Sequence, residues 1–193
     1  MTYAESRGLV NIQGEVEGVF VDLGYARERN SFGRRLYDGD EAYLLAPAAR
    51  RLAAAAAAAY QAGLSLVVLD AYRPLSVQAL MWEILPDDDF VAPPSRGSIH
   101  NRGAAVDVTL ATRDGRRLPM PSEYDEFSER ASHEYAGGGE PERRNRETLR
   151  DIMIGAGFAP YVAEWWHYVD PELRGSPLID VPISALRREA GPG

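Results

Sequence analysis

The chain has 193 residues, a length that fits one compact domain and suffices to bury a hydrophobic core. Apolar residues make up 45% of the chain and charged residues 26%, a balance that is typical of folded proteins and excludes a disordered chain. The formal net charge of -8 argues against nucleic acid or an anionic membrane as the main partner, because both bind basic surfaces.

The chain contains no cysteine, which excludes disulfides, thiol catalysis and cysteine-ligated zinc. A metal ion would therefore be held by His, Asp or Glu side chains, and the only histidines are His100, His133 and His167. Residues 1–7 lack a basic start followed by an apolar run, so no signal peptide is visible, and the apolar tract at 53–59 is too short to span a membrane. We therefore expect a cytoplasmic protein.

Short strands and two helices are expected in the first half of the chain. Alternation of apolar and polar residues predicts strands over residues 9–12 and 15–23. Residues 40–62 are rich in Ala and Leu and are followed by a glycine, which predicts a helix with a C-terminal glycine stop. A β-branched run at 64–69 predicts a buried strand, and apolar spacing predicts a helix over 76–84.

The second half begins with a Pro- and Asp-rich loop at 85–97. We expect a strand over 104–110, a helix from 141 to 156 and an aromatic strand-like segment over 158–169. This order of elements lacks a regular strand–helix alternation and therefore indicates an α+β fold. We expect a single domain over residues 1–193, with a central antiparallel sheet flanked by helices.

The first candidate cluster of functional residues spans 98–107 and contains His100 and Asp107. These two side chains cannot face the same way on one regular strand, because their positions have opposite parity. Gly103 permits a turn between them, so His100 is expected in a loop that folds back toward Asp107 on the following strand. The small residues beside Gly103 leave room for that close approach.

The second cluster is the segment Glu-Trp-Trp-His, in which Glu164 and His167 are three positions apart. That spacing gives one face on a helix, but the aromatic composition favours a strand, where the two side chains would point to opposite faces. If both residues serve one site, Glu164 must lie at a bend or at the loop edge before the strand.

Together the clusters supply two imidazoles, one carboxylate ligand and one spare carboxylate. This is the inventory of a catalytic zinc site, which has three protein ligands and leaves the fourth position to water. Zinc lowers the pKa of its bound water toward about 7 and polarises a peptide carbonyl. A carboxylate that is not a ligand can then carry the proton from the water to the leaving amine, and Glu164 is the candidate.

The patterns Ser-x-His-x-x-Gly-x-Ala-x-Asp at 98–107 and Glu-Trp-Trp-His at 164–167 resemble those of the D-alanyl-D-alanine dipeptidases. That family is part of a wider zinc-peptidase group that includes D-Ala-D-Ala carboxypeptidases and is similar to the hedgehog signalling domain. Further shared segments occur in the same order at 22–26, 30–33, 70–74 and 120–125. The resemblance covers roughly residues 20 to 170, and this conjunction is far more specific than any single motif.

The resemblance implies a hedgehog/DD-peptidase-like fold with one zinc ion per chain. It implies that His100, Asp107 and His167 are the zinc ligands and that Glu164 is the general base and acid. It also implies that Arg73 stabilises the oxyanion of the tetrahedral intermediate, a role that suits a permanently charged guanidinium.

For substrate binding, the resemblance implies that Tyr25 and Asp125 meet the ammonium group and that Ser98 meets the carboxylate. A small dipeptide held at both ends is therefore the expected substrate. Trp165 and Trp166 are expected to pack in the core.

Three residue-level alternatives remain beside these roles. His100 taken alone is more typical of a hydrogen-bonded loop histidine than of a metal ligand. Arg73 could merely pair with Asp70 on the surface. His133 matches no motif and is expected to be a solvated loop residue.

Two alternative functions also remain. One is a peptidoglycan D,D-carboxypeptidase or L,D-endopeptidase of the same group, against which the absence of a visible export signal argues. The other is a non-enzymatic zinc-binding module, against which the presence of Glu164 and Arg73 argues, since a structural zinc ion needs neither. The sequence does not specify the D or L preference, the physiological role or the oligomeric state.

Overall fold

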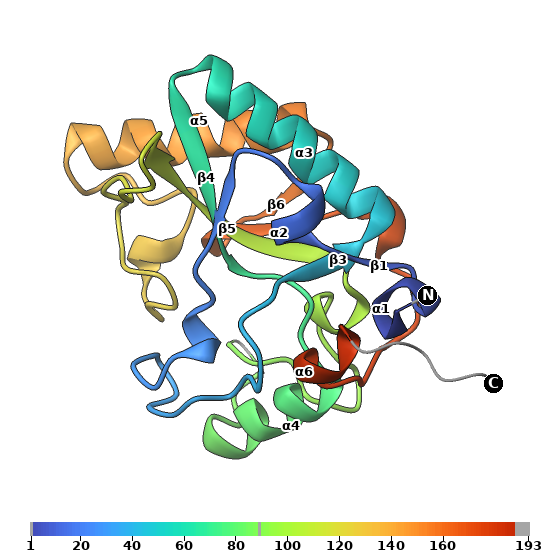
Figure 1. The fold of residues 1–193 in the computed structure, drawn as a ribbon. Helices are drawn as coiled ribbons and strands as arrows, with labels where there is room; N and C mark the ends of the chain where they lie inside the picture. Colours follow the sequence, from blue (N-terminus) through green and yellow to red (C-terminus); the bar gives the residue numbers. More distant parts are fainter. Residues whose placement is uncertain (1, 89, 188–193) are drawn as a thin grey trace.

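The structure is a computed structural model in which residues 2–88 and 90–187 are described. Its centre is a five-stranded sheet (Figure 1). In order across the sheet, the strands are β2 (Val19–Val21), β4 (Leu64–Asp70), β5 (Ala105–Thr112), β7 (Glu164–Val169) and β6 (Ala159–Tyr161). All neighbouring strands are antiparallel except β2 and β4, which are parallel. The α+β architecture is therefore as expected, with one parallel pair at the edge of the sheet.

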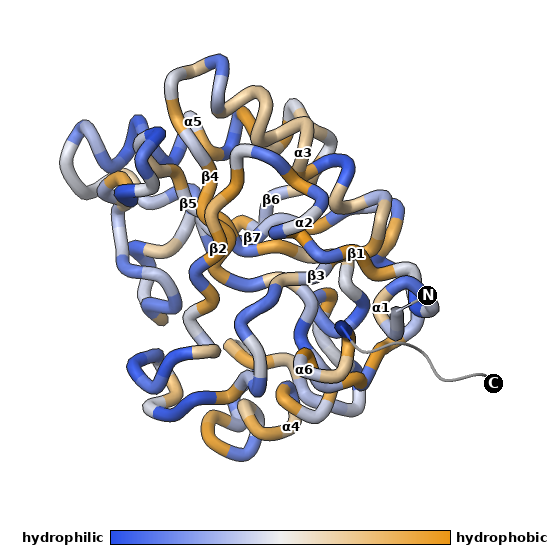
Figure 2. Tube along the Cα trace, viewed as in Figure 1, coloured by the Kyte–Doolittle hydropathy of each residue, from blue (hydrophilic) through white to orange (hydrophobic). Residues whose placement is uncertain are grey.

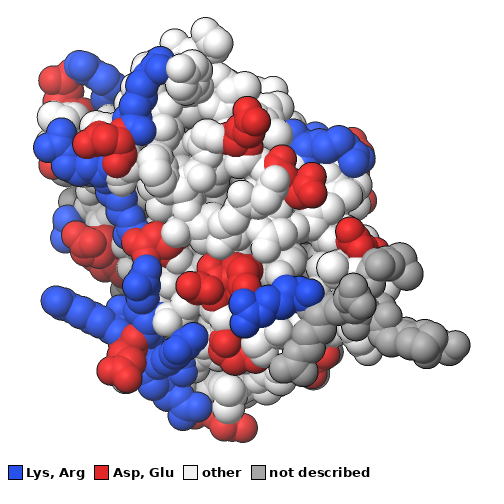
Figure 3. Space-filling model, viewed as in Figure 1, with Lys and Arg blue, Asp and Glu red and all other residues white. Residues whose placement is uncertain are grey.

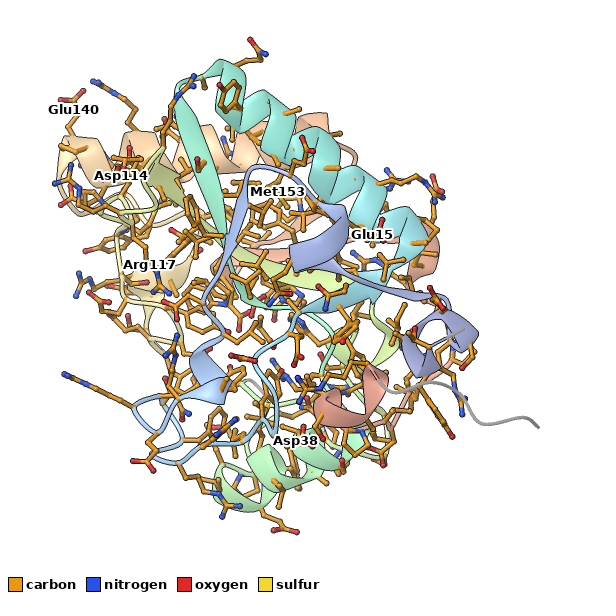
Figure 4. The ribbon with its side chains drawn as sticks, in the orientation of Figure 1. Glu15, Asp38, Asp114, Arg117, Glu140 and Met153 are labelled. Carbon is orange, nitrogen blue, oxygen red and sulfur yellow. The ribbon has the colours of Figure 1, made fainter. Side chains whose placement is uncertain are left out.

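Two long helices, α3 (Ala46–Gln61) and α5 (Glu140–Gly155), lie side by side over the sheet (Figure 1). Their inner positions are apolar and fully buried, among them Leu52 of α3 and Leu149 and Met153 of α5. Figure 4 places Met153 in the interior, whereas Glu140 at the start of α5 lies at the outside of the molecule. The apolar strands β4, β5 and β7 run through this interior (Figure 2).

The remaining elements surround the other end of the sheet. The helix α4 (Leu75–Ile84) lies below the sheet in Figure 1, near α6 (Ile183–Leu186). A small second sheet pairs β1 (Leu9–Asn11) with β3 (Tyr43–Leu45). The short helices are α1 (Tyr3–Ser6) and α2 (Ile12–Glu15), and the 3-10 turns are η1 (Gly24–Ala26), η2 (His100–Arg102), η3 (Glu129–Ala131) and η4 (Pro171–Leu173).

Three of the expected elements differ in the structure. The helix predicted over 40–62 begins only at Ala46, because the preceding residues pair with β1 as strand β3. The strand predicted over 15–23 is confined to β2, because Glu15 ends the short helix α2 and Gly18, just before the strand, has a left-handed φ of 75°. The segment 158–169 is a hairpin of two strands, β6 and β7, and not one strand.

Acidic and basic side chains lie next to one another along one margin of the face drawn in Figure 3. One example is Asp22, which pairs with Arg27 at 3.0 Å and with Arg117 at 2.6 Å. Within residues 2–88 and 90–187, no helix is long and apolar enough to cross a membrane.

Candidate metal centre and active site

Three separate segments bring His100, Asp107 and His167 together. Asp107 on β5 stands directly opposite His167 on β7, so both side chains project from the same face of the sheet. His100 lies in the 3-10 turn η2, which ends at Gly103 with a left-handed φ of 66°. The expected turn at Gly103 is thus present, and it returns the chain into β5 with His100 facing Asp107.

The nitrogen and oxygen atoms of this triad are close to one another. His100 Nε2 lies 3.2 Å from Asp107 Oδ1 and 3.1 Å from His167 Nδ1. His167 Nδ1 lies 3.0 Å from Asp107 Oδ1. Ligands of a tetrahedral ion at about 2.0–2.1 Å are separated from one another by about 3.3 Å. The donor set and its spacing therefore fit a zinc ion that leaves a fourth position open.

Hydrogen bonds from the surrounding protein hold two of these donors in place. His100 Nδ1 lies 2.7 Å from the carbonyl oxygen of Ala71, which fixes Nδ1 as the protonated nitrogen and leaves the Nε2 lone pair for a metal. The Tyr124 hydroxyl donates to Asp107 Oδ2 at 2.9 Å, which leaves Oδ1 directed toward the two histidines. The sequence reasoning did not assign this role to Tyr124, although the residue lies in one of the shared segments, 120–125.

Glu164 is the first residue of β7, which agrees with the expectation that it lies at the edge of a strand. It pairs with Tyr161 at the point where the register between β6 and β7 shifts, and such an irregularity re-aims side chains. Its Oε2 atom is 3.9 Å from His167 Nδ1. Burial raises the pKa of Glu164 to about 7, so this carboxyl group is suited to exchanging a proton near neutral pH.

Arg73 is buried, and it does pair with Asp70, but the pair is not on the surface. Arg73 Nη2 donates to Asp70 Oδ2 at 2.6 Å, and Nη1 donates to Gln78 Oε1 at 2.9 Å. Asp70 is fully buried and also accepts a hydrogen bond from the Tyr37 hydroxyl at 2.5 Å. The guanidinium group is therefore held rigidly, with its carbon 5.2 Å from the centre of the Tyr25 ring.

Tyr25 and Asp125 also line the site and are joined to each other. The Tyr25 hydroxyl donates to Asp125 Oδ2 at 2.6 Å. Asp125 is the only non-glycine residue in the described part of the chain with a positive φ, 59°, a conformation that Asp tolerates better than most residues. Burial raises the pKa of Asp125 to about 7, against the lowering effect of the Tyr25 hydrogen bond.

The residues predicted for the site line one cavity of about 400 Å³. Its lining includes every residue predicted for the site: Tyr25, Arg73, Ser98, His100, Asp107, Asp125, Glu164 and His167. The Ser98 hydroxyl oxygen accepts a 3.3 Å hydrogen bond from the His100 amide, which places Ser98 beside the triad. The eight predicted residues thus come from segments far apart in sequence and share one pocket.

His133 is not a solvated residue, contrary to the sequence expectation. Its side chain is only 7% exposed, because the ring packs edge-on against Tyr168 and its backbone amide donates to the Val162 carbonyl at 2.9 Å. Burial and the neighbouring Arg150 and Arg146 lower its pKa to about 4, so the ring is neutral. Trp165 and Trp166 are buried, as expected, and Trp165 donates a hydrogen bond to Ser122.

Comparison with known proteins identifies relatives along most of the chain. The D-alanyl-D-alanine dipeptidase of Escherichia coli (strain K12) is 39% identical over 160 residues, which cover 82% of this chain and 82% of the relative. The D-alanyl-D-alanine dipeptidase of Enterococcus faecium is 35% identical over 194 residues, which cover 87% of this chain and 94% of the relative.

A solved structure of the LdcB LD-carboxypeptidase matches the fold with a TM-score of 0.50 and 20% identity, over 86% of this chain and 71% of that one. At this identity the likeness concerns the fold alone. The family model described as D-ala-D-ala dipeptidase matches residues 5–183. The chain that gathers a His-Asp-His triad, Glu164 and Arg73 in one pocket therefore belongs to the D-Ala-D-Ala dipeptidase family of peptidases.

Proposed function

We propose that this chain is a zinc metallopeptidase that hydrolyses D-alanyl-D-alanine, or a closely related dipeptide, to free amino acids. The observation that carries the proposal is the triad of donors at 3.0–3.2 Å with the Glu164 carboxylate 3.9 Å from one of them, inside a cavity of about 400 Å³. The family match supports the substrate. We further propose that residues 1–193 act as one domain that binds one zinc ion, while a cytoplasmic location stays a prediction.

In this proposal His100, Asp107 and His167 hold the zinc ion. A bound zinc ion supplies a water of lowered pKa and polarises the substrate carbonyl. Glu164 would be the group that takes up a proton at its carboxylate and passes it to the nitrogen of the leaving amino acid. A pKa of about 7 supports both halves of that transfer, since the group is then neither too weak a base nor too weak an acid.

Arg73 is proposed to stabilise the negative charge that develops on the carbonyl oxygen. Its side chain is fixed by Asp70 and Gln78 before any substrate binds, and a preorganised charge of this kind costs no rearrangement during the reaction. The burial of the guanidinium strengthens its effect, because few water molecules screen it.

The two ends of the dipeptide are proposed to bind on opposite sides of the metal centre. Asp125 accepts hydrogen bonds from the substrate ammonium, with Tyr25 orienting the carboxylate through its 2.6 Å hydrogen bond. The bound ammonium would favour the ionised form of Asp125, whose pKa burial raises to about 7. Ser98, beside His100, receives the substrate carboxylate.

The test measures amine release from D-Ala-D-Ala, from L,D and L,L dipeptides, and from longer peptides ending in D-Ala-D-Ala. Zinc-loaded wild-type protein is compared with Glu164→Gln and with a control, Glu15→Gln, whose side chain is exposed on α2 (Figure 4). We expect hydrolysis of D-Ala-D-Ala that falls by about 10²- to 10⁴-fold in Glu164→Gln, with zinc content unchanged, and that is retained in the control.

Other outcomes would point elsewhere. Cleavage of the longer peptides at rates comparable to the dipeptide would favour the carboxypeptidase alternative. Stoichiometric zinc without cleavage of any peptide would favour a non-enzymatic zinc-binding module. Equal loss of activity in both Glu→Gln variants would contradict the proposed role of Glu164.

A further inference from the structure

A second cavity of about 260 Å³ lies next to the proposed active site. Four residues line both cavities, namely Phe90, Phe127, Glu164 and Trp166. Because Glu164 is the proposed proton carrier, the second cavity begins at the reacting centre and not at a remote part of the surface. The residues shared by the two cavities are therefore the wall that separates them.

Two of these shared residues form a contact between different segments of the chain. The rings of Phe90 and Phe127 stack with their centres 4.7 Å apart and an angle of 46° between their planes. Phe90 follows α4, and Phe127 lies in the segment between β5 and η3. The two rings are 43% and 37% exposed, so they contribute little to the core.

Both rings are nevertheless held in position by their neighbours. The residue after Phe90, Val91, is buried, and the Ala92 carbonyl accepts a 2.8 Å hydrogen bond from Gln78, which also contacts Arg73. Phe127 lies in a turn in which the Ser128 amide donates to the Glu126 carbonyl at 2.9 Å. The wall is thus a ring–ring contact between two loops, each of which makes hydrogen bonds beside its ring.

The charges around the two cavities differ. The lining of the second cavity, within the described residues, carries the carboxylates of Glu126, Glu129 and Glu164 and no arginine. The lining of the first cavity carries carboxylates too, but it differs in also holding four arginines, namely Arg73, Arg96, Arg102 and Arg174. A peptide carboxylate would be repelled from the second cavity, whereas an amino group or a cationic side chain would be attracted to it.

We propose that the Phe90–Phe127 pair limits this enzyme to dipeptides by blocking an N-terminal extension of the substrate from entering the second, acidic cavity. The inference rests on the proposed function and adds the residues that determine substrate length. Phe127 and Asp125, the proposed partner of the substrate ammonium, both line the first cavity, so the proposal places a residue added at the amino end beside this ring.

The test compares kcat/KM for D-Ala-D-Ala, for L-Lys-D-Ala-D-Ala, which is extended at the amino end, and for D-Ala-D-Ala-Gly, which is extended at the carboxyl end. The variant is Phe90→Ala/Phe127→Ala. The matched control is Phe20→Ala on β2, which removes a ring of similar exposure, 41%, that lines neither cavity. Zinc content and the D-Ala-D-Ala rate of the same samples report whether each variant is folded.

We expect the ratio of kcat/KM for L-Lys-D-Ala-D-Ala to that for D-Ala-D-Ala to rise at least tenfold in the double variant and to stay unchanged in Phe20→Ala. The ratio for D-Ala-D-Ala-Gly should not rise. An unchanged L-Lys-D-Ala-D-Ala ratio, or a gain restricted to the C-terminally extended peptide, would overturn the proposal. Loss of D-Ala-D-Ala hydrolysis with zinc retained would also overturn it, since the rings would then position the dipeptide itself.

A failure of the proposed function would give a different result, because the wild-type protein would then not hydrolyse D-Ala-D-Ala at all. The wall is then tested by binding alone, in the Glu164→Gln background, where L-Lys-D-Ala-D-Ala should bind at least tenfold more tightly once both rings are removed. Equal affinity for L-Lys-D-Ala-D-Ala with and without the two rings would overturn the proposal that they block the amino end.

Discussion

Tyr124 makes a side-chain hydrogen bond from outside the triad to a proposed metal ligand, at 2.9 Å to Asp107 Oδ2. Hydrogen-bonded partners of this kind orient a ligand and tune its affinity. Tyr124 also packs edge-on against Trp166, with ring centres 5.4 Å apart, so removal of the hydroxyl group alone leaves its packing intact. The hydroxyl group can therefore be tested without disturbing the ring.

We predict that Tyr124→Phe weakens zinc binding by about ten- to a hundredfold. The measurement is competition for zinc with a chelating indicator at a fixed pH, which does not depend on activity. Tyr60→Phe on α3 is the control, because that ring is 52% exposed and lies under Arg113. Zinc affinity equal to wild type in Tyr124→Phe would contradict the proposed ligand arrangement.

His133 gives the fold a predictable dependence on pH. Its pKa is about 4 in the folded chain and about 6.5 in the unfolded chain. Between these values the unfolded state binds the extra proton, so the free energy of unfolding falls as pH drops from 6.5 to 4 and no further below 4. The contribution lost from pH 7 to pH 4.5 is about 2 kcal/mol.

Urea unfolding of metal-free wild type and His133→Gln at pH 7 and pH 4.5 measures this contribution. We expect the wild type to lose about 2 kcal/mol more than the variant over that range. All other side chains are common to the two proteins, so their contributions cancel in the difference. A variant that loses as much stability as wild type would show that His133 is not kept neutral by burial.

At the scale of elements, the turn between η2 and β5 decides whether the triad forms. Gly103 has a φ of 66°, and a Cβ atom added there would lie 2.7 Å from Leu9 Cδ2 and 3.4 Å from the backbone nitrogen of Leu45. The position therefore needs glycine for two reasons, its backbone conformation and its contact with β1 and β3. Both reasons can be separated by comparison with Gly18.

We predict that Gly103→Ala lowers the free energy of unfolding by about 1–3 kcal/mol more than Gly18→Ala does. Gly18 has a similar φ of 75° but no atom within 4 Å of an added Cβ, so it reports backbone strain alone. Chemical denaturation of the two variants gives the difference. Equal losses would mean that the contact with Leu9 and Leu45 is relieved at no cost.

The elements with strong local signals were predicted well, and those that depend on distant partners were not. The apolar run of β4 and the i, i+3, i+4 spacing of α5 are properties of the local sequence, and both elements lie where expected. By contrast, the predicted start of α3 was too early, because no local feature of residues 43–45 indicates that they pair with β1. The hairpin of β6 and β7 was missed for a different reason, because residues 162–163 include no Gly, Pro, Asn or Asp that would mark its turn.

At the scale of the whole molecule, the proposed zinc ion joins β5, β7 and the turn η2 through side chains only. An ion that binds the folded chain and not the unfolded chain stabilises the fold by mass action. At free zinc a thousandfold above the dissociation constant, this amounts to about 4 kcal/mol. Metal removal should therefore affect the stability of the whole chain and not only its activity.

We predict that removal of zinc by EDTA lowers the melting temperature by roughly 8–16 °C, since about 1 kcal/mol corresponds to 2–4 °C for a protein of this size. Scanning calorimetry with and without zinc is the measurement. Glu164→Gln should keep the shift, because it is not a proposed ligand, whereas His167→Ala should lose it. An EDTA effect that persists in His167→Ala would place the stabilising metal elsewhere.

Residue types and short-range spacing were enough to indicate the composition of the site and the class of fold. With no cysteine and three histidines, the search for metal ligands was confined to a few residues, and the resemblance of 98–107 and 164–167 to the dipeptidase motifs implied which ones. These features are local, since they depend on residue type and on neighbours within about ten positions. For the same reason, the resemblance to the dipeptidases is visible in the amino-acid sequence alone.

The packing of distant segments established how these residues are supported and what surrounds them. The hydrogen bond of Tyr124 to Asp107, the burial of His133 and the stacked Phe90–Phe127 wall each join segments that are far apart in the chain. No local pattern encodes such contacts, because they form only when the strands and loops pack together. The proton chemistry depends on packing in the same way, since burial in the assembled pocket raises the pKa of Glu164.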